Sequence, residues 1–465
     1  MRQALVPVLL MVSLAALSGC FGGGKTDEAP PAATSTEPTP MARPTLADPV
    51  RMTPVRLGEG AGEPNIAVAP DGTIYVTPID HVYRSSDGGK SFEDLGTTRT
   101  NGHGDGDIAI DATGRIHWLG LFGDAGPIPY QQSDDRGKTF SKGFDVSAKD
   151  GKKDGTGSDR EWIDVTPDGI VYTSWRDSDD GGIIGARTSF DGGLTWEDRV
   201  TMSPDAVGGP IVHGPKPGQV FEAMTTFSDS PAPGEGTGAA IKVARSFDNG
   251  STWDLVDAVV PPQSVQFGLI GFPTSIFPVA AVDDAGTLYV VFSADQRALP
   301  AATPKPAARY GAYLIASTDL GAHWTEPKLL SNPDHAAVMP FAAAGAAGRI
   351  AVTWYESTVG LPSDNLPDLW NVNLWESVTA DQASPEGRLV QLNEQPNHIG
   401  SVCTAGTGCL AGGDRSLLDY FEVAIQPNGH PVATWSYSVA GTAVGLAAQG
   451  TDIWVGGVAS GTPLR

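Results

Sequence analysis

The stretch Ser246-Phe247-Asp248-Asn249-Gly250-Ser251-Thr252-Trp253 decides the fold, because four other parts of the chain repeat its pattern of Ser, Asp, Gly, a polar residue and an aromatic residue. With ordinary residue frequencies, one such match is expected on the order of 0.01 times in a chain this long. The five copies are therefore a true repeat. They cover residues 85–92, 133–140, 189–196, 246–253 and 317–324.

Each copy has the chemistry of a tight hairpin turn. The Asp carboxylate accepts backbone N–H bonds, the Gly two residues later adopts a positive φ, and the hydroxyl side chains satisfy further groups of the turn. We expect the closing Trp or Phe to start the returning strand and to bury its ring. The five aspartates are then structural rather than catalytic: Asp87, Asp135, Asp191, Asp248 and Asp319.

A second repeat runs in phase with the first. Seven times a short apolar run reaches a glycine turn and continues as another apolar run, with turn glycines from 42 residues apart (Gly72 to Gly114) to 81 residues apart (Gly348 to Gly429). This spacing is typical of one four-stranded blade per unit. We therefore predict an all-β protein, a β-propeller of seven blades, with six as the alternative if one of the last units is an insertion. The seven turn glycines are Gly72, Gly114, Gly169, Gly218, Gly286, Gly348 and Gly429.

The order within a unit is strand A, glycine turn, strand B, variable loop, strand C, Asp turn and strand D. Units one to five carry the Asp turn, whereas units six and seven lack it. The run Pro54-Val55-Arg56-Leu57 precedes the first unit and has no partner strand there. We expect it to join the last blade and close the ring, which would leave no exposed sheet edge.

The N-terminus indicates export. Residues 4–17 are apolar, with the length of a signal-peptide core rather than of a membrane span, and Leu17-Ser18-Gly19-Cys20 follows. These four residues resemble the lipobox of prokaryotic lipoproteins. We expect a signal peptide over residues 1–19, a lipidated Cys20 with a disordered tether over residues 20–50, and the propeller over residues 51–465. The alternative is an ordinary signal peptide with an incidental cysteine.

This interpretation places the protein outside the cytoplasm, anchored to the membrane at the cell surface. Cys403 and Cys409 lie in a loop of small residues, and in that compartment we expect them to form a disulfide. The formal net charge is −24, from 54 acidic and 30 basic side chains. Such a field repels phosphate backbones, so we expect no nucleic-acid partner.

The sequence contains no zinc spacing, phosphate loop or Ser-His-Asp pattern, so we expect no cofactor. Calcium is the one metal considered, at residues 177–180, because close carboxylates in a glycine-rich turn suit a hard cation. The same run is otherwise a solvated loop. We expect the protein to be a monomer.

The Asp turns on a propeller resemble the Asp-box, or BNR, repeats of the sialidase superfamily. The resemblance covers about residues 55–460 and concerns the fold rather than one activity. It implies that the Asp boxes lie on the face opposite the sugar pocket. The pocket would then be built from the starts of the A strands and from the B–C loops.

Sialidases hold a sugar carboxylate with three arginines, attack with a tyrosine assisted by a glutamate, and use an aspartate as the acid and base. The segment 419–429 resembles the part of these enzymes that carries the nucleophile. Carried over by position, the resemblance implies Tyr420 as nucleophile, Glu356 or Glu161 as its base, Asp105 or Asp107 as acid and base, and Arg160, Arg297 and Arg415 as the clamp, with Arg176 in reserve.

Two features of the sequence leave the roles of these residues open. Where the family places its first clamp arginine, this chain has Glu63, and a carboxylate there would repel a sialic acid. The charged groups at 159–161 and 414–415 are equally compatible with ion pairs at the mouth of the ring, and Tyr420 with an ordinary half-buried strand tyrosine.

Three functions remain. The first is a surface glycoside hydrolase of exo-sialidase type, or a degenerate relative, acting on a glycan or glycoprotein. The second is a non-catalytic propeller that binds glycan or protein through the same face. The third is a scaffolding factor for other envelope proteins. Whether the protein is an enzyme stays undecided at this stage.

Overall fold

The computed structural model describes residues 45–60, 62–79, 81–97, 105–123, 126–148, 157–226, 240–260, 277–295, 310–358, 368–400, 402, 414–438 and 451–465. All of them belong to one compact unit, Arg43–Arg465. Cys20, Arg297, Cys403 and Cys409 lie outside the described residues.

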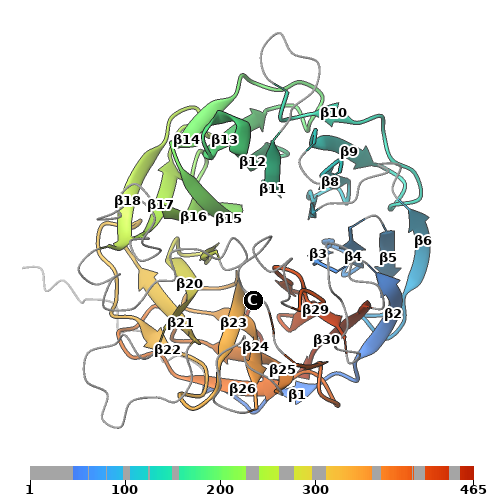
Figure 1. Cartoon of the computed structure of the whole chain (residues 1–465), viewed down its shortest axis with the longest axis vertical. Helices are drawn as coiled ribbons and strands as arrows, with labels where there is room; N and C mark the ends of the chain where they lie inside the picture. Colours follow the sequence, from blue (N-terminus) through green and yellow to red (C-terminus); the bar gives the residue numbers. More distant parts are fainter. Residues whose placement is uncertain are drawn as a thin grey trace, which may run out of the picture. The chain divides into compact units, whose positions relative to one another are not determined.

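Seven antiparallel sheets are arranged radially around a common axis, so the prediction of a seven-bladed propeller is confirmed (Figure 1). Blade 1 comprises β3 Pro64–Val68, β4 Ile74–Pro78, β5 His81–Ser85 and β6 Glu93–Thr97. Blade 2 comprises β7 Gly106–Ile110, β8 Ile116–Gly120, β9 Pro129–Ser133 and β10 Phe144–Asp145. Blade 3 comprises β11 Ser158–Val165, β12 Val171–Asp177, β13 Ile183–Ser189 and β14 Val200–Ser203.

Blades 4 to 6 follow the same order of strands A to D. Blade 4 comprises β15 Ala206–His213, β16 Val220–Thr226, β17 Ala240–Ser246 and β18 Asp254–Val259. Blade 5 comprises β19 Val279–Val282, β20 Leu288–Asp295, β21 Tyr310–Ser317 and β22 Lys328–Leu329. Blade 6 comprises β23 Ala337–Ala344, β24 Ile350–Ser357, β25 Leu369–Ser377 and β26 Gly387–Gln391, with β27 His398–Ile399 added beside β25.

Blade 7 is completed by both ends of the described chain. Its strands A to C are β28 Val423–Ile425, β29 Pro431–Tyr437 and β30 Thr451–Ser460. The outer position is filled by β1 Val50–Arg51 and β2 Val55–Gly60, which both pair with β30. The predicted closure by residues 54–57 is confirmed, and the outer edge of the last sheet is paired as a result.

The predicted A–B turns are also present. Each of the seven turn glycines has a positive φ, between 72° for Gly348 and 88° for Gly286. Only glycine adopts this conformation without a steric cost, which is why these positions mark the repeat in the sequence. The only helix among the described residues is the 3-10 turn η1 Ser178–Asp180, and no helix there is long and apolar enough to cross a membrane.

The Asp turns, which we call Asp boxes after their sequence pattern, join strands C and D at the same end of the blades as the A–B turns. In the third box, Asp191 Oδ1 accepts from the Thr195 backbone N–H at 2.8 Å, and the Thr195 hydroxyl donates to Asp191 Oδ2 at 2.6 Å.

The prediction that the closing aromatic residue starts strand D and buries its ring is wrong. The closing aromatic residue lies before strand D and is half-buried, as Trp196 before β14 shows, because the box needs its own turn residues before the chain can return.

The boxes also hold neighbouring blades together. In blades 1 to 4, the residue just before the box serine donates to the carbonyl of the fourth box residue in the next blade, and we call these contacts the interblade clasps. The clasps are Arg84 Nη1 to Arg136 O at 2.9 Å, Gln132 Nε2 to Gly192 O, Thr188 Oγ1 to Asn249 O at 2.9 Å and Arg245 Nη1 to Leu320 O at 2.8 Å. In blade 5, which faces a blade without a box, this position is Ala316.

The hydrophobic core lies between the blades. Its largest fully buried side chains are tryptophans and tyrosines of the inner strands, among them Trp162, Trp354 and Trp435. Burial of such a ring contributes about 1.5–3 kcal/mol. The blades are therefore held by packing between sheets, and the polar ends of the strands remain available for other roles.

Candidate functional site

The starts of the A strands from blades 1, 2, 3 and 7 bring charged residues together, and we call this region the mouth. Glu63 precedes β3, Asp105 precedes β7, Asp159 to Glu161 lie in β11, and Arg415 to Tyr420 precede β28. The strand order puts the mouth at the opposite end of the blades from the A–B turns and the Asp boxes. The predicted separation of the two faces is therefore present.

Unusual backbone conformations direct these side chains. Glu63, Arg160 and Leu418 have φ values of 49°, 55° and 54°, a region that residues other than glycine seldom occupy. In β11 the pairing register also shifts between Asp159 and Trp162, as in a β-bulge. Such conformations cost about 1–3 kcal/mol each and are often found at functional sites.

Two of the predicted clamp arginines meet on a carboxylate of the protein itself. Arg160 Nη2 donates to Asp419 Oδ2, and Arg415 Nη1 lies 2.9 Å from Asp419 Oδ1. All three side chains are buried. Burial alone would raise the pKa of Asp419, but the two arginines hold it below its usual value. Asp419 thus occupies the position that the resemblance assigns to a substrate carboxylate.

Among the remaining acids of the mouth, the charge of Asp105 acts most strongly on the pKa values of the others. Burial raises the pKa of Glu63 well above its usual value, and the charge and hydrogen bond of Asp105 raise it further. Burial followed by the charge of Asp105 also raises the pKa of Glu161 strongly and that of Asp159 to about 6. Asp105 and Asp159 are half-buried, whereas Glu63 and Glu161 are buried. The mouth therefore holds several carboxyl groups whose pKa values are raised both by burial and by the charge of a neighbouring carboxylate.

Tyr420 is part of the mouth but is firmly held. Its hydroxyl donates to Gly106 O at 2.9 Å, and its ring packs edge-on against Trp162 with the centroids 5.1 Å apart. Phe277 packs against the same ring and against the Arg160 guanidinium. Burial raises the pKa of Tyr420 well above its usual value, so its hydroxyl is neutral.

Asp107 has a different environment from Asp105 although it is only two residues away. Its two oxygens accept backbone N–H bonds from Ile108 at 2.7 Å and from Ile163 at 2.8 Å. The second bond joins blade 2 to blade 3. Glu422 plays the same part between blades 7 and 1, accepting from the Ile66 backbone at 2.8 Å. The structure therefore favours Asp105 over Asp107 as the acid facing the mouth.

The other predicted residues contact different groups. Glu356 accepts from Trp354 Nε1 at 2.6 Å and lies 3.1 Å from His335 Nδ1. Arg176 donates to Ala206 O at 3.0 Å, at the boundary of blades 3 and 4.

The acidic run considered for calcium is paired with a cation of the protein. Arg199 forms ion pairs with Asp177 at 3.0 Å and with Asp180 at 2.8 Å. Within the described part of the chain, no group of three or more His, Cys, Asp or Glu residues could hold a metal ion.

Two members of the mouth were not singled out by sequence reasoning. Asn65 donates to Glu422 at 3.2 Å and to the Tyr420 hydroxyl at 3.4 Å. Phe277 forms a wall against Trp162 and Tyr420. Asn65 follows Glu63-Pro64 directly, so its place at a strand start was a usable signal, whereas no pattern in the sequence marks Phe277.

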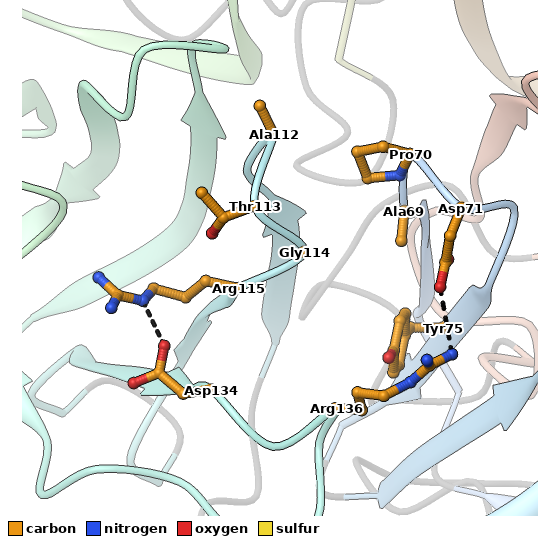
Figure 2. Close-up of a pocket in the computed structure, with 10 residues that line it drawn as sticks. All are labelled: Ala69, Pro70, Asp71, Tyr75, Ala112, Thr113, Gly114, Arg115, Asp134 and Arg136. Carbon is orange, nitrogen blue, oxygen red and sulfur yellow. Dashed lines mark hydrogen bonds and ion pairs between the residues drawn. The ribbon is translucent and has the colours of Figure 1, made fainter.

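A cavity of about 340 Å³ lies at the opposite end of the blades, between the A–B turns of blades 1 and 2 (Figure 2). Arg115 pairs there with Asp134 at 2.6 Å, and Arg136 with Asp71 at 3.3 Å. The two arginines and two aspartates cancel in charge. This balance gives no preference for an anion or a cation.

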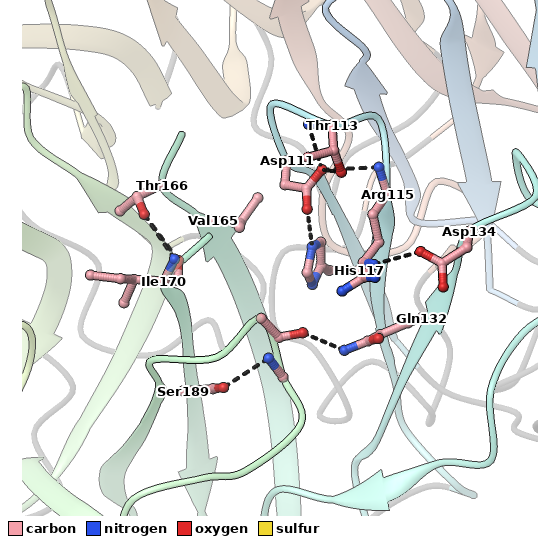
Figure 3. Close-up of polar contacts among 12 residues, drawn as sticks. Asp111, Thr113, Arg115, His117, Gln132, Asp134, Val165, Thr166, Ile170 and Ser189 are labelled. Atoms are coloured by element: carbon pink, nitrogen blue, oxygen red, sulfur yellow. Dashed lines mark hydrogen bonds and ion pairs between the residues drawn. The ribbon is translucent and has the colours of Figure 1, made fainter. Parts of the chain in front are cut away.

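A polar network lies beneath the turn of blade 2 (Figure 3). Asp111 accepts from the Thr113 hydroxyl at 2.6 Å, and its other oxygen lies 3.4 Å from His117 Nε2. His117 Nδ1 is 2.7 Å from the Tyr130 hydroxyl. His117 is fully buried, and burial lowers its pKa, so this network supports the turn rather than proton transfer at a surface.

Comparison with known proteins gives similarity in structure only. No protein-family model and no curated protein sequence matches the chain. An α-L-arabinofuranosidase of Fusarium graminearum is 12% identical, with a TM-score of 0.47, over 88% of this chain and 98% of that one. An intramolecular trans-sialidase from Ruminococcus gnavus is 12% identical, with a TM-score of 0.39, over 82% and 90%. A protein of unknown function from Dyadobacter fermentans is 12% identical, with a TM-score of 0.44, over 89% and 99%.

Proposed function

We propose that the protein is a glycan-directed propeller that hydrolyses glycosidic bonds at the mouth with carboxyl groups. One observation carries this proposal: Asp105 is the charge that acts most strongly on Glu63, Asp159 and Glu161, which come from two other blades. Carboxyl groups in unequal environments around one opening supply both the acid and the base that such a reaction needs.

Glu161 has the properties of the general acid. It is 1% exposed, and neither of its carboxyl oxygens has a hydrogen-bond partner among the described residues. Burial and the charge of Asp105 raise its pKa well above the usual value, which favours the protonated carboxyl group. A protonated carboxyl of this kind can donate to the oxygen of a leaving sugar.

Asp105 has the properties of the partner carboxylate. It is half-buried, so it can approach a sugar ring or a water molecule, whereas Glu161 is enclosed. It also accepts a hydrogen bond from Glu63, whose pKa is raised by burial and by the charge of Asp105. Tyr420 then forms the wall of the mouth through its contact with Trp162, rather than serving as the nucleophile.

The test is a hydrolysis screen of the full chain on fluorogenic glycosides with neutral, anionic and cationic sugars. We expect Asp105→Asn and Glu161→Gln each to lower kcat/KM by at least about 100-fold, the usual contribution of a general acid or base. Glu376→Gln is the matched control, because Glu376 is also buried and without a partner among the described residues but lies on β25 of blade 6. Turnover that is equal in the parent and in both mouth variants would refute the proposal.

A non-catalytic glycan binder is the second candidate. The observation that favours it is that Arg160, Arg415 and the Tyr420 hydroxyl are all engaged within the protein. Saturable glycan binding without turnover of any glycoside in the screen, lost in Asp105→Asn, would support this candidate.

We also propose that the propeller is tethered to the outer surface of the membrane through a lipid on Cys20. The support is the run Leu17-Ser18-Gly19-Cys20 after an apolar stretch. In bacteria fed a labelled fatty acid, the full chain should take up the label and fractionate with membranes. Cys20→Ala should abolish the label and release the protein, and a parent without label would refute the anchor.

A further inference from the structure

The charge that the mouth offers to a ligand is negative. Arg160 and Arg415 both contact the single carboxylate of Asp419, and all three residues are at most 6% exposed. The carboxyl groups of the mouth outnumber these two guanidinium groups. Glu63, Asp105, Asp159 and Glu161 remain, and no lysine or arginine in the described part of the chain forms an ion pair with any of them. Among the described residues, an incoming anion would therefore meet carboxyl groups, whereas the two arginines are buried and engaged by Asp419.

Glu161 shows that this cluster is incomplete without a ligand. A buried carboxyl group usually has hydrogen-bond partners, and both oxygens of Glu161 lack one among the described residues. The charges that act on it are those of Asp105, Asp159 and Asp107, so the side chain lies toward the mouth. A donor or a cation entering the mouth would satisfy it.

The chemistry of the cluster favours an organic cation over a metal. No group of three or more His, Cys, Asp or Glu residues within the described ranges could hold a metal ion. An ammonium group needs no fixed coordination sphere, because each of its N–H bonds can donate to a separate carboxylate. Trp162 and Tyr420 are buried and pack against each other behind the cluster, so the polar groups of the mouth are the ones left to contact a ligand.

We propose that the mouth selects glycans that carry a positively charged amino sugar and rejects glycans that carry a carboxylate. This inference rests on the mouth being the glycan site of the proposed function, and it names the substrate class of that site. It requires binding at the mouth, but it does not require turnover.

Proton release is a consequence of such binding. A cation favours the ionised form of the carboxyl groups around it, so the raised pKa values must fall when it binds. The affinity for the cation should then increase as the pH rises from 5 and the carboxyl groups ionise, and it should fall again where the amino groups of the sugar lose their protons. The titratable and charged groups at the mouth are Glu63, Asp105, Asp107, Asp159, Arg160, Glu161, Arg415, Asp419, Tyr420 and Glu422.

The test compares three tetrasaccharides by calorimetry on the full chain at pH 6.5: β-1,4-linked glucosamine, its fully N-acetylated counterpart and galacturonate. We expect the glucosamine tetramer to bind at least about tenfold more tightly than the acetylated one, since one charge contact near the surface is equivalent to about that factor. The galacturonate tetramer should bind most weakly. Buffers with different ionisation enthalpies should reveal the released proton.

Two variants separate a charge effect from a loss of fold. Asp105→Asn, at a half-buried position, should abolish most of the preference for glucosamine over the acetylated tetramer, while its melting curve stays as cooperative as that of the parent. Asp419→Asn should shift the preference toward galacturonate by freeing Arg160 and Arg415, provided that its melting curve is cooperative. Equal binding of the three tetramers, or tighter binding of galacturonate by the parent, would overturn the inference. Selective binding without hydrolysis would support it while refuting the hydrolase.

Discussion

Glu222 shows how a single buried acid makes stability depend on pH. It is fully buried on β16, and its carboxyl group fits against β15 because residue 208 is glycine: a Cβ there would lie 1.9 Å from Glu222 Oε1. Burial raises its pKa to about 8, and the nearby Ser174 hydroxyl offsets this only in part. The folded protein therefore holds a proton that the unfolded chain releases near pH 4.5.

The sign of the effect follows from proton binding. Below about pH 4 both states are protonated, and Glu222 contributes no pH dependence. Between about pH 4.5 and 8 the unfolded state loses its proton first, so the free energy of unfolding falls as the pH rises. We expect Glu222→Gln to reduce this loss between pH 5 and pH 8 by about 3 kcal/mol. Urea unfolding at the two pH values measures it, with the exposed Glu394→Gln as control. Equal losses in parent and variant would contradict the prediction.

Tyr420 provides a second prediction at the residue scale. Its hydroxyl donates to Gly106 O at 2.9 Å and accepts from Asn65 at 3.4 Å. Tyr420→Phe should lower the free energy of unfolding by about 1–2 kcal/mol, because two buried groups lose a partner. It should lower any glycoside hydrolysis by less than about tenfold, since Asp105 and Glu161 are the reacting groups.

Tyr355→Phe is the matched control for this change. The Tyr355 hydroxyl is also fully buried and bonded to the backbone, donating to Ser436 O at 3.3 Å and accepting from Ser436 N at 3.1 Å, but it lies on β24 of blade 6, which contributes none of the charged residues of the mouth. It should lose a similar amount of stability with no change in activity. A fall of more than about 100-fold in Tyr420→Phe alone would restore the tyrosine as nucleophile.

The residues of the mouth could be predicted from the sequence, but not their partners. Arg160, Arg415 and Tyr420 stand at strand starts, which the repeat already locates. The pairing of Arg160 with Asp419 joins residues 259 positions apart on different blades, and no sequence spacing indicates such a contact. Asp105 and Asp107 also look equivalent in the sequence, and only the position of the Ile163 N–H distinguishes them.

At the scale of the element, the interblade clasps make the second to fifth Asp boxes each contact the preceding blade as well as their own. The fourth box residue has a positive φ in every box, 61° for Leu320 and 65° for Arg136, which turns its carbonyl outward to the preceding blade. The preceding blade supplies a donor directly before its own box serine. Local turn chemistry and packing between blades are thus linked through a single backbone carbonyl.

The clasp of Arg245 can be tested against a surface arginine. Arg245 donates to Leu320 O at 2.8 Å and also pairs with Asp254. We expect Arg245→Ala to lower the free energy of unfolding by about 1–2 kcal/mol, the usual range for a hydrogen bond from a charged donor. Arg388→Ala removes only an exposed ion pair with Asp48 and should cost less than about 1 kcal/mol. Equal losses in denaturant unfolding would show that the clasp adds nothing.

Strand boundaries show which elements a repeat can predict. The A–B hairpins are predicted well, because a glycine with positive φ fixes the turn between two apolar runs. The D strands are predicted poorly. β10 and β22 have two residues each, and their sequences carry little alternation of apolar and polar residues because one edge faces solvent.

At the scale of the whole molecule, closure of the ring depends on a strand from the far end of the chain. Val55 pairs with Val455, and Leu57 packs near Ile453 and Val455 in a cluster with Ile66 of blade 1. The sequence predicted this closure because residues 54–57 resemble a strand and have no local partner. Blade 7 would otherwise expose the edge of β30, so its stability depends on a contact of very high sequence separation.

A covalent link across this closure tests whether the ring opens there first. Cysteines at Val55 and Val455 would join registered partners of β2 and β30 and close a very long loop. In the chain-entropy model such a link stabilises by about 5 kcal/mol, so we expect Tm to rise by roughly 5 °C or more, reversed by reductant. Cysteines at Thr434 and Val455 link β29 to β30 over a short loop within the same blade and form the control. If unfolding begins at the closure, only the long link should also slow unfolding in denaturant. Equal unfolding rates for the two links would show that the ring opens between other blades, and the seam next to blade 6, which lacks an Asp box, would be the next candidate.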